Sequence, residues 1–110
     1  MPDIVLKEEV RNNKPWCLLV AEVIDSKLTV TRVDFEEWGR NSRSGQVEIS
    51  HIYDEENTRR FMESLDETDS DKFLRKLKAT FSKGSGITIM HDISEYCKKH
   101  KIDFRYYVWY

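Results

Sequence analysis

The chain has 110 residues, of which 39% are apolar and 35% charged, with a formal net charge of −2. This length suits one domain with a single core, and an aromatic content of 12% argues against a disordered chain. No apolar run reaches the roughly 20 residues of a membrane span, and the start MPDIVLKEEV lacks the pattern of a secretory signal. We therefore expect one domain, residues 1–110, in the cytoplasm. Cys17 and Cys97 are 80 positions apart, and we expect two free buried thiols there, with a disulfide as the alternative.

The charge is distributed unevenly along the chain. Residues 35–67 carry nine acids and four bases, a net charge of −5, whereas residues 68–110 carry five acids and nine bases, a net charge of +4. An acidic middle and a basic C-terminal third can steer a charged partner onto one face. The same numbers also fit helices whose solvated faces simply mix acids and bases.

Strand patterns fill much of the N-terminal half. Residues 16–24 are apolar on both alternating faces, which is typical of a strand covered on both sides. A turn at Asp25 and Ser26 leads to an alternating strand over 27–35, so the two form a hairpin. After a Gly- and Ser-rich loop, the alternation returns over 47–53. The first segment, residues 2–13, fits either a strand or a short helix.

Helical spacing replaces the strand pattern from Asp54 onward, where an N-cap residue precedes two acids. Further helices are predicted over 71–83 and 88–101, and the chain closes with a strand over 102–110. The fold class is therefore α+β: an antiparallel β-meander of four or five strands, including the C-terminal strand, packed against about three helices.

The closing strand ends on FRYYVWY, with alternate residues on opposite faces. We expect one set to pack in the core against the helices: Phe104, Tyr106, Val108 and Tyr110. The other set should lie on the less covered face of the sheet: Arg105, Tyr107 and Trp109.

Motifs for metal, cofactor and covalent chemistry are weak. His51, His91 and His100 lack the spacing of metal ligands, and the sequence has no CxxC or HExxH. Residues 84–86, GSG, precede a helix, but capping alone explains them. We therefore predict no cofactor, no metal and no enzymatic activity.

A small metal-free nuclease or nucleic-acid-binding domain is the alternative. His51 would serve as its base, with His91 or His100 as a second group. The basic C-terminal third would bind phosphates, and its aromatic residues would stack on bases. The acidic overall pI, about 5.9, argues against nucleic acid as the partner. An interaction module with a structural or phage-type role is a third possibility.

Acids of the middle segment form the candidate partner-binding surface. Carboxylates around an aromatic anchor suit a basic protein, because the charges speed encounter and the anchor supplies buried area. A solvated face with a core tryptophan explains the same pattern. The residues are Glu36, Glu37, Trp38, Asp54, Glu55, Glu56, Glu63, Asp66 and Glu67.

The chain from residue 47 onward also carries a family-like series of residues: Tyr53, Thr58, Phe61, Leu65, Phe81, a Gly-Ser turn, Ile93, Tyr96-Cys97 and Ile102-x-Phe104. This series resembles the small immunity proteins that bacteria encode beside polymorphic or contact-dependent toxins, with Tyr96-Cys97 standing where those families have Phe-Cys. The resemblance implies a non-catalytic cytoplasmic protein. Such a protein neutralises a toxin, often a basic nuclease encoded by an adjacent gene, by covering its active or another essential surface. Residues 1–46 match no family pattern.

Overall fold

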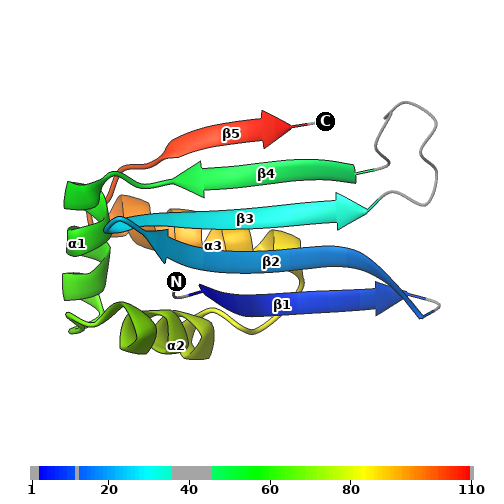
Figure 1. Ribbon diagram of the computed structural model, residues 1–110, viewed down its shortest axis with the longest axis horizontal. Helices are drawn as coiled ribbons and strands as arrows, with labels where there is room; N and C mark the ends of the chain where they lie inside the picture. The colour runs from blue at the N-terminus through cyan, green and yellow to red at the C-terminus, as the bar shows by residue number, and fades with distance from the viewer. Residues whose placement is uncertain (1–2, 12, 36–45, 110) are drawn as a thin grey trace.

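An antiparallel sheet in the order β1-β2-β3-β4-β5 forms one layer of the protein (Figure 1). The computed structural model describes residues 3–11, 13–35 and 46–109. Its strands are β1 (Asp3–Arg11), β2 (Lys14–Ile24), β3 (Lys27–Phe35), β4 (Gln46–Ile52) and β5 (Arg105–Trp109). Its helices are α1 (Glu55–Ser64), α2 (Ser70–Thr80) and α3 (Gly86–Lys99). The α+β class and the meander are confirmed, and the ambiguous first segment is a strand.

Turns and caps place these elements where the sequence signals them. Asp25 and Ser26 adopt positive φ angles of 52° and 64°, as a tight two-residue hairpin turn requires. Asp54 and Asp69 cap α1 and α2, and Ser85 forms a capping box with Thr88 at the start of α3. Capping thus accounts for the GSG segment, as expected.

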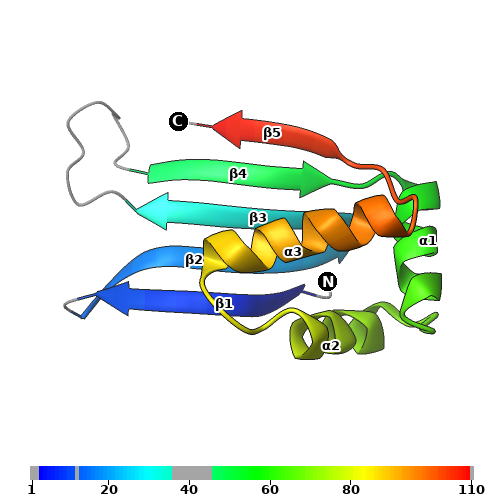
Figure 2. The ribbon, with the colours of Figure 1, turned by 180° about the vertical axis from the view of Figure 1, so that it is seen from behind.

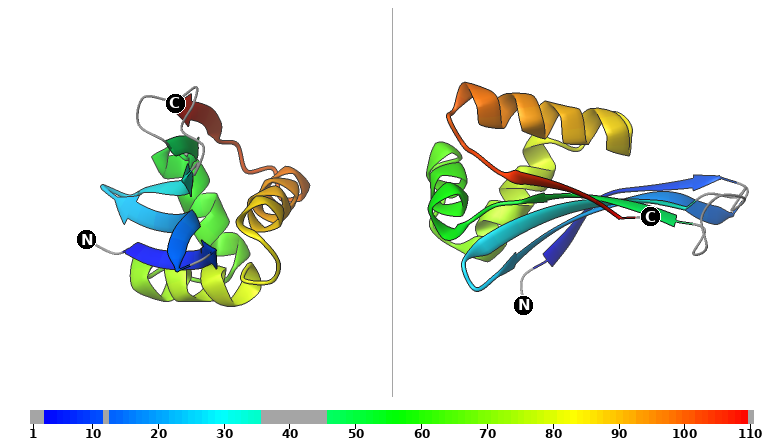
Figure 3. Two further views of the ribbon diagram at one scale, coloured as in Figure 1. Left: turned by 90° about the vertical axis from the view of Figure 1, so that its right-hand side faces the viewer. Right: turned by 90° about the horizontal axis from the view of Figure 1, so that it is seen from above.

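The helices pack on one face of the sheet (Figures 2 and 3). The strand residues that face them are buried because β2 and β3 turn alternate apolar side chains toward the helix layer. The core includes Leu19, Ala21, Leu28, Val30, Phe61, Phe73, Leu77, Ile89 and Ile93. Among the described elements, none covers the opposite face of β2. The prediction that this strand is covered on both sides is therefore wrong for this part of the chain.

Among the described strands, the last one, β5, lies at the edge of the sheet and pairs with β4 alone. Phe104, just before it, packs against His51 with ring centroids 4.1 Å apart, as the core prediction required. Tyr106 is 61% exposed, so its predicted place in the core is wrong. The reason is that α3 packs against β1, β2 and β3. It does not lie over β5, which forms the far edge of the sheet (Figure 2). Within the described ranges, no helix has the length and apolarity needed to cross a membrane.

Candidate functional site

A groove of about 710 Å³ runs between α1 and the turn that joins β2 to β3. One wall is α1, and the connection from α1 to α2 closes one end. The lining residues are Val23, Ser26, Glu55, Glu56, Thr58, Arg59, Met62, Glu63, Glu67, Thr68 and Ser70. The structure therefore brings together Glu55, Glu56, Glu63 and Glu67, all of them predicted partner-binding residues.

The acids reach this groove because of the helical period of α1. Thr58 and Phe61 point into the core and fix which face of the helix is buried. Glu55 and Glu63 are eight residues apart in the sequence, so they lie on one face, with Arg59 between them at i+4 spacing. Arg59 was not among the residues predicted for this surface, although its i+4 spacing from Glu55 and Glu63 already signals its position.

The groove is acidic because its carboxylates outnumber the positive charges along its walls. Arg59 is the basic residue that lines it. Two lining acids have ion-pair partners: Glu56 lies 3.2 Å from Arg60, and Glu67 lies 3.9 Å from Lys76. Among the described residues, Glu55 and Glu63 form no ion pair. Their charges therefore remain available to a partner.

The other predicted acids have different positions. Asp54 lies outside the groove, and its carboxylate accepts a 2.8 Å hydrogen bond from the backbone N–H of Asn57. Hydrogen bonds from Asn57 hold the pKa of Asp54 below its usual value. Asp66 is exposed just after α1 with a positive φ of 58°. The predicted anchor segment, Glu36, Glu37 and Trp38, lies outside the described residues.

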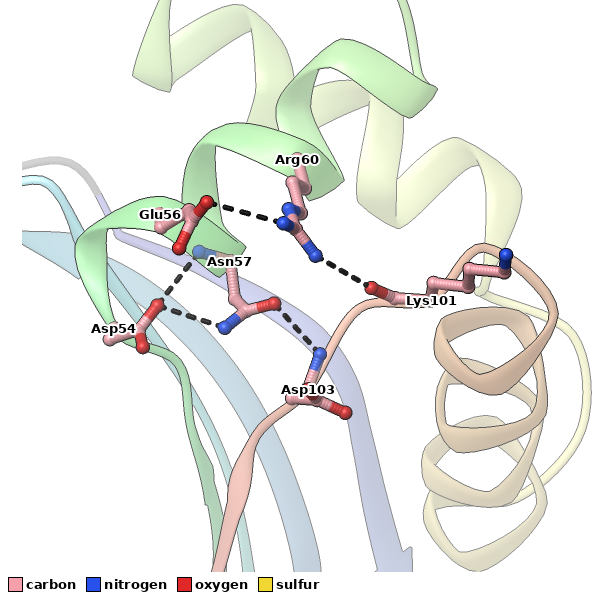
Figure 4. Close-up of polar contacts among 6 residues, drawn as sticks. All are labelled: Asp54, Glu56, Asn57, Arg60, Lys101 and Asp103. Atoms are coloured by element: carbon pink, nitrogen blue, oxygen red, sulfur yellow. Dashed lines mark hydrogen bonds and ion pairs between the residues drawn. The ribbon is translucent and has the colours of Figure 1, made fainter.

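A polar network ties the start of α1 to the segment that leads into β5 (Figure 4). Asn57 is its centre: its side-chain amide donates to Asp54 at 3.0 Å, and its side-chain oxygen accepts from the Asp103 backbone N–H at 2.9 Å. Arg60 donates to Glu56 at 3.2 Å and to the Lys101 carbonyl at 3.3 Å. These bonds fix the N-terminal end of the groove wall. The contact of Asn57 with Asp54 was missed, although an Asx N-cap followed three residues later by Asn was its signal.

His51, the base of the alternative nuclease reading, lies inside the protein. The residue is 5% exposed, and its ring stacks on Phe104 with centroids 4.1 Å apart and lies tilted against Tyr106 at 5.7 Å. Burial, with a smaller effect of the Arg32 charge, lowers the pKa of His51 to about 4. His91 is exposed on α3, and the ring of His100 lies tilted against that of Tyr96, with centroids 4.1 Å apart. This arrangement suits a packed core residue better than a base that must reach a substrate.

The two thiols are buried and free, as predicted. Burial and the nearby Asp34 raise the pKa of Cys17 to about 12, and burial raises that of Cys97 to about 11. A raised pKa disfavours the thiolate that nucleophilic chemistry needs. Among the described residues, no group of three or more His, Cys, Asp and Glu side chains is arranged to hold a metal ion.

The bases of the C-terminal third are divided among α2, the last turn of α3, β5 and the connections that hold Lys83 and Lys101. Two of them form ion pairs with nearby acids: Lys76 with Glu67 at 3.9 Å and Lys98 with Glu95 at 3.6 Å.

Comparisons with protein-family models, with curated proteins and with solved structures find no match to this chain.

Proposed function

We propose that this protein is a non-catalytic immunity protein that binds a basic bacterial toxin, a nuclease being the favoured class, and occludes its active or essential surface. The observation that carries the proposal is the acidic groove along α1, where Glu55 and Glu63, which have no ion-pair partner among the described residues, lie beside Glu56 and Glu67. A basic protein segment complements such a groove in charge and in shape. The buried position of His51 supports a binding role over the nuclease alternative.

The groove has further features that suit a protein ligand. Its lining includes the buried Val23 and the half-buried Met62, whereas Glu55, Glu56 and Glu63 are exposed. Interfaces commonly combine an apolar centre with a polar rim, since the centre supplies buried area and the rim supplies steering and register. The proposed complex would form in the cytoplasm with the product of an adjacent gene.

The test is co-expression with the product of the neighbouring gene, followed by purification of the complex and calorimetric measurement of its Kd. A double variant, Glu55→Lys with Glu63→Lys, reverses both unpaired charges and is expected to weaken binding on the order of a hundredfold. The control is Asp92→Lys with Glu95→Lys, which reverses the same charge on the exposed side of α3. This control should bind within about threefold of the wild type.

Protection of cells that express the toxin should follow the same order as the Kd values. Equal binding by the groove variant and the wild type would show that α1 is not part of the interface. An absence of both complex formation and protection with the neighbouring gene product would overturn the function itself. Degradation of RNA or DNA by the purified protein, lost in His51→Ala, would establish the nuclease alternative instead.

A further inference from the structure

The sheet face opposite the helices carries an apolar cluster on β1, β2 and β3. Strand pairing defines it, because Val5 pairs with Val20 and Leu18 pairs with Val33. Leu18 and Val20 alternate along β2 with the buried Cys17, Leu19 and Ala21, so these two residues and their cross-strand partners lie on the face away from the helices. In Figure 1, α3 lies behind the sheet, on the other side from this face. We call these four residues, Val5, Leu18, Val20 and Val33, the open-face cluster.

This cluster is accessible to a partner. Val5 is 42% exposed, and the other three are half-buried, although no described helix lies over them. Trp16 and Phe35 extend the same face as half-buried neighbours. Open faces of antiparallel sheets usually carry polar side chains, so a contiguous apolar cluster there is typical of an interaction surface.

Carboxylates surround the open-face cluster. Glu8 pairs with Leu18, Glu48 pairs with Val33, and Asp3 pairs with Glu22 in the row next to Val5 and Val20. Lys27 and Arg105 lie at the α1 end of this face, opposite Ile24 and Ile52. Among the residues of this face whose side chains the structure describes, the four carboxylates outnumber the two bases, so the charge beside the cluster is negative.

We infer that the open face binds a second protein segment, one that presents aliphatic side chains flanked by lysine or arginine. The cluster supplies apolar area, and the carboxylates of Asp3, Glu8, Glu22 and Glu48 select the charge of the partner. A second copy of this chain fits less well. In a face-to-face pair, each copy would bring the same carboxylates to the contact, and like charges in an interface are unfavourable.

This surface is distinct from the groove along α1. The groove-lining strand residue Val23 is 5% exposed and points toward the helix layer, whereas Val20 and Leu18 point the other way. The two surfaces can therefore be tested separately, and the open-face inference does not depend on the toxin being identified.

Labelled peptides test the inference directly with the intact protein. The first peptide alternates lysine and leucine, the second alternates glutamate and leucine, and the third alternates lysine and serine. Fluorescence anisotropy should show binding of the first peptide and at least about tenfold weaker binding of the other two, because both aliphatic area and positive charge are required.

Variants locate the binding face. Val20→Thr with Val33→Thr keeps β-branched side chains in the strands but removes aliphatic area, and should weaken lysine–leucine peptide binding by about tenfold. Ile87→Thr is the matched control, since Ile87 is 54% exposed on α3. Glu55→Lys with Glu63→Lys should also leave this binding unchanged. Thermal melts of all variants verify that the sheet is intact.

Charge reversal completes the test. Glu8→Lys with Glu48→Lys should shift the preference toward the glutamate–leucine peptide. Equal binding of the first two peptides by the wild type, or binding lost only in the α1 groove variant, would overturn the inference. Concentration-dependent dimerisation in sedimentation, abolished by Val20→Thr with Val33→Thr, would overturn it in favour of a second copy. Failure of toxin binding with intact peptide binding would reject only the proposed function.

Discussion

The backbone N–H of Leu28 donates a 2.9 Å hydrogen bond to Oγ1 of Thr58, so the start of β3 is bonded to α1 inside the core. The two residues are 30 positions apart, and both are buried. Thr58→Val keeps the side-chain shape but leaves this amide without its acceptor. We expect the free energy of unfolding in urea to fall by about 1–3 kcal/mol, the usual cost of a buried unpaired amide.

Thr80→Val is the control for this hydrogen bond. The Thr80 hydroxyl donates to the Lys76 carbonyl at 2.7 Å on the exposed side of α2. Because water can replace that bond, the change should be within about 0.5 kcal/mol. A Thr58→Val protein as stable as the wild type would show that the bond between β3 and α1 contributes nothing net.

Acid should destabilise the fold through His51. The pKa of this side chain is lowered from 6.5 to about 4 in the folded protein, mainly by burial. Between these values the unfolded chain binds a proton that the folded chain does not. Stability contributed by neutral His51 is therefore complete above about pH 6.5 and is lost as the pH falls toward about 4, by roughly 3 kcal/mol in total.

Urea unfolding between pH 7 and pH 4 measures this loss. His51→Phe, which can still stack on Phe104, should flatten the dependence over that interval. His91→Gln, at an exposed position of α3, should leave it as in the wild type. An unchanged pH dependence in His51→Phe would assign the acid sensitivity to other groups.

The close approach of α3 to β2 depends on Gly86. A Cβ at this position would lie 2.6 Å from Sγ of Cys17, and the Gly86 N–H donates to Oε1 of Glu9 at 2.6 Å. Gly86→Ala should therefore destabilise the protein by about 1–3 kcal/mol, although alanine favours helices. In a Cys17→Ala background the sulfur is absent and the cost should fall below about 1 kcal/mol. Equal costs in the two backgrounds would contradict the steric explanation.

Both thiols should react slowly in the native protein. Cys17 and Cys97 have pKa values raised to about 12 and about 11, and each is buried. An aromatic disulfide reagent at pH 8 should modify both only as fast as the protein opens, and at once in guanidinium chloride. Rapid modification of either cysteine in the native state would place it at an accessible surface.

The fold was largely predictable from sequence because its signals are local. Strand alternation, the Asp25-Ser26 turn and the N-caps each act over a few residues, and all agree with the structure. Whether a second layer covers a face of the sheet is not encoded locally. Apolar residues on both faces of β2 suggested two covering layers, but whether a second layer exists depends on where the helices pack. Tyr106 was misplaced for the same reason, since its exposure follows from the path of α3.

The candidate site was predictable only in part. Helical spacing explains why Glu55 and Glu63 share a face. It gives no information on Ser26, which reaches the same groove from a turn of the sheet. The polar contacts of Asn57 with Asp103 span 46 residues, so no local pattern reveals them.

The connection from β4 to β5 contains all three described helices, and yet these two strands are direct neighbours. The helical layer is thus a single insertion between β4 and β5, which pair antiparallel as the two strands of a hairpin do. Changes in the length or sequence of that insertion can therefore reshape the α1 groove without altering the order of strands in the sheet. A lineage of such proteins could diversify its recognition on the helical side, while the sheet keeps its register and its opposite face unchanged.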